Sequence, residues 1–202
     1  MAQEEKIFFE LFVDALPGLV IVVLAVWIFW PEQKSDADVD SLPQAQISFE
    51  KPRGVFYDRY QNGANEIQKS NVWNESNENL CSFVKENGRV FENWVGAVEN
   101  LDTNQGGSEI TNFTIVSDVF GVELEYQFLN ALAIRDDVTI SKGSEVYNQL
   151  AQLSIGDMVS FSFTFERGNK VKCINEGSLT EYGSINNPEY NVIFKEVKKL
   201  QL

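Results

Sequence analysis

The stretch that decides the fold is GDMVSFSFTFERGNK, residues 156–170. Hydrophobic residues occupy every second position from Val159 to Phe165, and Ser or Thr occupies the positions between them. Successive side chains of a β-strand point to opposite faces, so this alternation predicts a strand that buries one face.

Four further stretches also read as strands: 91–101 (FENWVGAVENL), 109–118 (EITNFTIVSD), 121–128 (GVELEYQF) and 187–200 (NPEYNVIFKEVKKL). In the third of these, Glu123, Glu125 and Gln127 are expected to point outward. A short helix, capped by Ser144, is expected within 141–157, and 171–180 is a candidate for an extra strand. Three strands, one helix and two or three strands are the element order of an OB-fold, a Greek-key barrel. A β-sandwich is the alternative.

A helical segment is expected before the barrel, over 54–88, where hydrophobic residues recur at roughly helical spacing and Gly88 provides a stop. The preceding 31–53 is polar and acidic and contains three prolines, which indicates a flexible linker. The sequence therefore predicts a mainly β, α+β chain. An OB-like barrel of five or six strands over 89–202 follows one or two helices.

The N-terminal residues 7–30 (IFFELFVDALPGLVIVVLAVWIFW) predict a membrane anchor. A helix needs about 20 apolar residues to cross the hydrocarbon core. The run has neither the basic start nor the small-residue cleavage site of a signal peptide. We therefore expect an uncleaved transmembrane helix within 1–30, with an amphipathic start.

Glu10 and Asp14 lie one helical turn apart ahead of Pro17, so both carboxylates share one helix face. Three readings remain open: an interfacial start that reaches water, burial against a partner helix, or a relay for protons or ions. Pro17 favours the first reading, because proline breaks or kinks a helix. Counting Lys and Arg near the span ends places the N-terminus in the cytoplasm and the main domain outside it.

A family resemblance is carried by 93–101 (NWVGAVENL), 143–165 (GSEVYNQLAQLSIGDMVSFSFTF) and 178–197 (SLTEYGSINNPEYNVIFKEV). These runs resemble membrane-anchored bacterial proteins with an OB-like domain, within the broad tRNA-anticodon-binding-like OB group. The resemblance covers roughly residues 60–200. It implies the OB-like fold, whereas function does not follow from fold.

Charge and residue usage narrow the classes of function. With 16 Lys and Arg against 30 Asp and Glu, the net charge is −14, which disfavours nucleic acid as a partner. Histidine, the commonest general base and metal ligand, is absent. We find no catalytic motif, metal-ligand spacing or cofactor fingerprint, so no catalytic residue, metal or cofactor is predicted.

Cys81 and Cys173 lie far apart and form no CxxC pair. An oxidising compartment would allow a disulfide between them, and two buried free thiols are the alternative.

These observations predict a single-pass protein of a bacterial cytoplasmic membrane whose OB-like module lies outside the cytoplasm. We expect it to bind a protein or a small ligand as an accessory part of an envelope complex. A protein partner would meet it through the transmembrane helix or the barrel. The alternatives are a cytoplasm-facing OB domain that binds single-stranded nucleic acid, and an unrecognised hydrolase.

Overall fold

The computed structural model describes residues 41–129, 139–168 and 172–201. All of them belong to one compact unit, Ala37–Leu202. Within these residues, no helix is both long and apolar enough to cross a bilayer. The predicted anchor at 1–30 lies outside the described residues.

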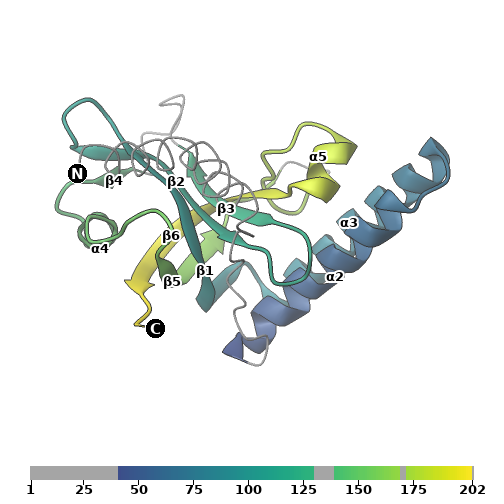
Figure 1. Ribbon diagram of the computed structural model, residues 1–202, viewed down its shortest axis with the longest axis horizontal. Helices are drawn as coiled ribbons and strands as arrows, with labels where there is room; N and C mark the ends of the chain where they lie inside the picture. Colours follow the sequence, from purple (N-terminus) through teal and green to yellow (C-terminus); the bar gives the residue numbers. More distant parts are fainter. Residues whose placement is uncertain (1–40, 130–138, 169–171, 202) are drawn as a thin grey trace, which may run out of the picture. The chain divides into compact units, whose positions relative to one another are not determined.

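Five strands close into a barrel (Figure 1). They are β1 (Val90–Thr103), β2 (Glu109–Ser117), β3 (Leu124–Leu129), β5 (Met158–Phe165) and β6 (Glu189–Lys199). Neighbouring strands pair antiparallel except β3 and β6, which are parallel, and the pairing of β1 with both β5 and β2 closes the ring. The two-residue β4 (Ile140–Ser141) pairs with the start of β2. The prediction of a barrel is confirmed, and its topology is consistent with an OB-like α+β fold.

The barrel interior is filled by the residues that the alternation predicted to face inward. On β5, Val159, Phe161, Phe163 and Phe165 are at most 1% exposed. A bulge in β1 adds Trp94 to the same core as Phe91, although a spacing of three would place them on opposite faces. Asn93 has a φ of 59° at this bulge, a conformation that asparagine tolerates better than most residues. The extra residue therefore lets both rings point inward.

Two long helices precede the barrel. They are α2 (Gln44–Gln61) and α3 (Glu66–Asn87), and they run side by side in Figure 1. Asn65 caps α3 by accepting a hydrogen bond from the Gln68 amide at 3.0 Å. Helical structure thus begins at Gln44, within the segment predicted as a linker.

The reason for this difference is the buried face of α2. It carries the polar side chains of Gln46, Glu50 and Arg53, and Pro52 lies in the helix interior. A helix with a polar buried face and an internal proline gives no hydrophobic periodicity to read.

Helix α2 crosses one end of the barrel. Phe49 is completely buried among barrel rings, with centroids 5.4 Å from Trp94 and 5.2 Å from Tyr190. The Gln46 side chain donates to the Val95 carbonyl at 2.7 Å and accepts from the Val95 amide at 2.8 Å. Val95 lies two residues before Ala97, the first residue of β1 that pairs with β2. The two bonds therefore attach α2 to a part of β1 that β2 does not reach.

The short helix α4 (Glu145–Leu150) lies between β4 and β5 and on the other side of the barrel from α2 and α3 in Figure 1. Ser144 caps it, as predicted, by accepting from the Tyr147 amide at 3.2 Å. The candidate extra strand at 171–180 does not form over its described residues, 172–180. They form two isolated bridges, Arg167 to Ile174 and Glu176 to Tyr190, before the helix α5 (Glu181–Asn186).

Candidate ligand-binding face

Strand register brings carboxylates together on the outside of the barrel. Glu125 on β3 lies opposite Glu189 on β6 and opposite Val116 on β2. Its inward neighbours Leu124 and Tyr126 are at most 1% exposed, which leaves Glu125 pointing outward. We call the set Glu99, Glu123, Glu125 and Glu189 the acidic face.

The carboxylates of the acidic face repel one another. Partial burial, together with the charges of Glu99, Glu189 and Glu123, raises the pKa of Glu125 to about 7. Burial and Glu123 likewise raise the pKa of Glu99. Among the described residues, no Lys or Arg forms an ion pair with these four groups. The only hydrogen bond to their side chains in this part of the chain comes from Gln127, which donates to Glu189 at 3.2 Å.

This arrangement suits a cationic ligand and opposes a polyanion. In OB-folds, the outer surface around strands 2 and 3 contacts oligonucleotides or oligosaccharides. Clustered carboxylates there attract positive charge and repel phosphates. Within the described residues, no three Asp, Glu or Cys side chains are grouped so as to hold a metal ion. The acidic face is therefore a group of outward carboxylates without a metal-binding arrangement in the described part of the chain.

A second polar cluster is enclosed beneath α2. Glu50 is 1% exposed and accepts hydrogen bonds from Gln46 at 2.9 Å, Tyr126 at 2.8 Å and Ser117 at 2.8 Å. Burial outweighs these three donors and raises the pKa of Glu50 to about 7. Because its donors come from α2, β2 and β3, the cluster ties the helix to the barrel.

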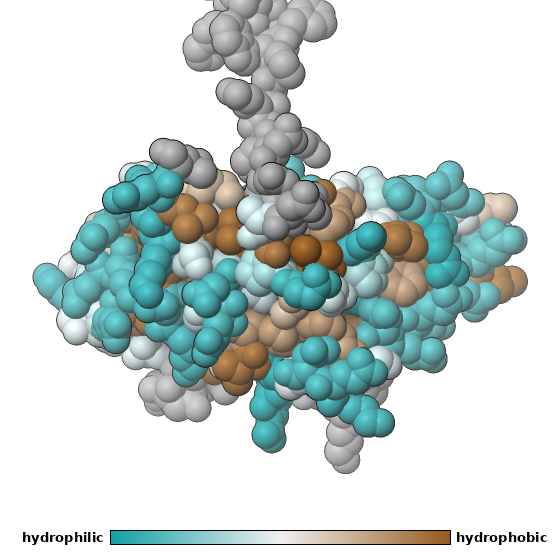
Figure 2. Space-filling model, turned by 90° about the horizontal axis from the view of Figure 1, so that it is seen from below, coloured by the Kyte–Doolittle hydropathy of each residue, from teal (hydrophilic) through white to brown (hydrophobic). Residues whose placement is uncertain are grey.

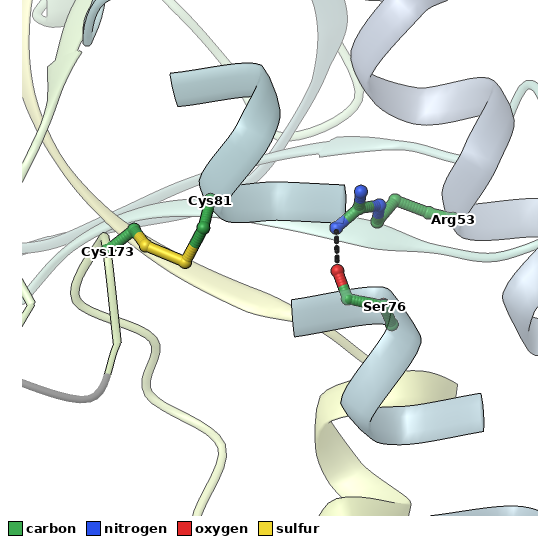
Figure 3. The surroundings of a disulfide bond; sticks show 4 residues. All are labelled: Arg53, Ser76, Cys81 and Cys173. Carbon is green, nitrogen blue, oxygen red and sulfur yellow. Dashed lines mark hydrogen bonds between the residues drawn. A yellow bond between two sulfur atoms is a disulfide. The ribbon is translucent and has the colours of Figure 1, made fainter. Parts of the chain in front are cut away.

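Cys81 and Cys173, 92 residues apart, are joined as a disulfide with their Cα atoms 5.3 Å apart. Figure 3 shows the bond running from α3 to the connection between β5 and β6. Near it, the Arg53 side chain of α2 reaches α3, where it donates to the Ser76 carbonyl at 3.5 Å and to Asn79. The disulfide and Arg53 thus join three separate parts of the chain.

The structure describes some of the predicted site residues and not others. The structure brings the two cysteines together, whereas Glu10, Asp14 and Pro17 lie outside the described residues. Sequence reasoning placed Glu123 and Glu125 on an outward face but missed Glu99, Glu189 and Glu50. Alternation gives the face of one strand, but only the register shows which strands are neighbours.

Comparison with family models, with curated proteins and with solved structures gives no match to this chain.

Proposed function

We propose that this chain is a single-pass membrane-anchored module with an OB-like barrel. It binds a positively charged protein or small ligand as an accessory part of a bacterial envelope complex. The observation that carries the proposal is the acidic face, because four carboxylates without an ion pair in the described part of the chain form a surface that a cationic partner would neutralise.

Two further observations support the proposed location. The apolar run at 7–30 is long enough to anchor the chain. The disulfide between Cys81 and Cys173 is typical of proteins exposed to an oxidising environment, such as the periplasm or the cell surface. The apolar run favours attachment to a membrane, and the disulfide favours a barrel held outside the cytoplasm.

The test is co-purification of the full chain from membranes in mild detergent. One variant removes three charges from the acidic face (Glu99→Gln, Glu123→Gln and Glu125→Gln). A matched control removes three exposed carboxylates elsewhere (Glu78→Gln, Glu86→Gln and Glu145→Gln). We expect a partner to be recovered with the wild-type chain and the control, in a salt-sensitive manner, and to be lost with the face variant.

Equal recovery by both variants would exclude the acidic face as the binding surface. Tight, salt-sensitive binding of a single-stranded oligonucleotide to the purified chain would instead favour a nucleic-acid-binding domain.

A further inference from the structure

The connection between β5 and β6 exposes large apolar side chains beside the start of α3. Leu179 is 99% exposed and Tyr182 is 64% exposed. Ser70 on α3 donates to the Glu181 carboxylate at 2.8 Å, and Ile67, 75% exposed, lies one helical turn before Ser70. We call Ile67, Leu179 and Tyr182 the α5 corner.

Hydrogen bonds and packing against the two long helices hold the α5 corner in place. Thr180 caps α5 by accepting from the Gly183 amide at 3.0 Å, and Ser178 donates to the Asn187 carbonyl at 3.1 Å. Ile185, only 4% exposed, packs in a cluster with Tyr60 and Val72 of the two long helices. The exposed leucine therefore sits on an ordered support, which reduces the entropy lost when a partner binds it.

The charges around the corner indicate what kind of surface would cover it. Glu66, with a side chain 86% exposed, and Glu181 flank the apolar residues. Lys69 lies 3.5 Å from Glu66 and 5.8 Å from the centre of the Tyr60 ring. A second copy of this chain, with a net charge of −14, would be repelled, and so would anionic lipid headgroups. A basic protein surface is complementary.

The backbone that leads into the corner also bonds to the strand that carries Glu189 of the acidic face. The Gly177 amide, two residues before Leu179, donates to the Glu189 carbonyl at 2.8 Å. On the side of the molecule drawn in Figure 2, hydrophobic areas lie among hydrophilic residues. The backbone therefore links the α5 corner to the strand that carries Glu189 of the acidic face.

We infer that the α5 corner is an anchor for a protein partner that offers an apolar pocket rimmed by Lys or Arg. Leu179 and Tyr182 enter the pocket, and Glu66 and Glu181 face its basic rim. Buried apolar anchors surrounded by polar contacts supply most of the affinity of protein interfaces. The inference rests on the proposed function and names the chemistry of the partner.

The test places the photo-crosslinking residue p-benzoylphenylalanine at position 182 of the full chain in native membranes. A second probe at position 123 reports the acidic face separately. Leu179→Ser removes the anchor, and Glu66→Gln with Glu181→Gln removes the acidic rim. Val90→Ser, at a 62% exposed apolar residue of β1, is the matched control. We expect Leu179→Ser to lower the protein adduct at least tenfold and the rim variant several-fold, with no loss in the control.

Support requires that the cross-linked peptide of the partner maps to an apolar pocket flanked by Lys or Arg. A lipid adduct, an adduct with a second copy, or an adduct insensitive to Leu179→Ser overturns the inference. If the probe at 123 captures a protein and the probe at 182 does not, the corner is excluded and the proposed function stands. If neither probe captures a protein, the inference is wrong and so is the protein-binding form of the proposed function.

Discussion

Replacing Glu50 by Gln removes a buried titratable group and leaves the shape of the side chain nearly unchanged. Glu50 lies between α2 and the barrel, where burial is the main cause that raises its pKa from 4.5 to about 7. A tenfold change in proton affinity corresponds to about 1.4 kcal/mol. The raised pKa of Glu50 therefore corresponds to about 3 kcal/mol of folding free energy that depends on pH.

Whether stability rises or falls with pH depends on which state, native or unfolded, binds the proton more tightly. Between pH 4.5 and 7 the native chain keeps Glu50 protonated while the unfolded chain ionises it. The stabilisation is therefore complete below pH 4.5 and is lost as pH rises through 7. In the wild-type chain, Glu50 should lower the free energy of unfolding by about 3 kcal/mol between pH 4.5 and 8. Glu50→Gln should abolish this contribution and be the more stable form at pH 8.

The assay is urea unfolding of the full chain in mild detergent from pH 5 to 8, followed by tryptophan fluorescence. Trp94 is completely buried, with its ring centre 5.5 Å from that of Tyr126, a donor to Glu50, so its emission should report loss of this packing. Glu86→Gln, at an exposed carboxylate of α3, is the control. If Glu50→Gln keeps the same pH dependence as the wild type and the control, Glu50 is not the linked group and the reasoning fails.

Three further changes test the packing. Replacing Cys81 and Cys173 by Ser should lower the free energy of unfolding by about 4 kcal/mol, because the disulfide closes a loop of roughly 92 residues; a reductant should destabilise the wild type similarly and leave the variant unaffected. Phe49→Ala should cost about 3–5 kcal/mol in denaturant titrations, since its ring is completely buried. Replacing glycine by alanine normally stabilises a helix, but a Cβ atom at position 54 would lie 2.2 Å from the Phe120 carbonyl oxygen. Gly54→Ala should therefore lower the melting temperature and cost about 1–3 kcal/mol of stability. A rise in melting temperature would contradict this.

The strands of the barrel could be predicted because each carries its own pattern. The inward positions of β5 are nearly all phenylalanine, and β3 alternates apolar residues with Glu and Gln. Local alternation is enough to find a strand that buries one face. The order of strands and the helix α4 then restricted the fold to a few choices.

Helix α2 could not be found in the same way, because it is stabilised by contacts that are distant in sequence. Gln46 and Glu50 are polar side chains whose partners, Val95 and Tyr126, lie far along the chain. Arg53 is buried against Phe49 and Phe56 rings at 5.3 and 5.7 Å. Such residues read as a solvated linker until the donors and acceptors around them are known.

The acidic face and the disulfide could be predicted only in part from the sequence. Outward carboxylates on β3 followed from alternation, whereas the approach of Glu189 depends on the parallel pairing of β3 with β6. For the cysteines, the sequence allowed either a disulfide or two free thiols and favoured the free thiols. Their approach depends on α3 lying against the connection between β5 and β6, which no local pattern encodes.

The bond between Gln46 and Val95 gives the molecule an internal reporter. The Val95 amide hydrogen is held by a helix side chain instead of a neighbouring strand, so its exchange with deuterium is controlled by whether α2 stays seated. An amide deeper in the ladder between β5 and β6 would exchange only when the barrel opens. The difference between the two exchange rates would measure how often the helix leaves while the barrel remains intact.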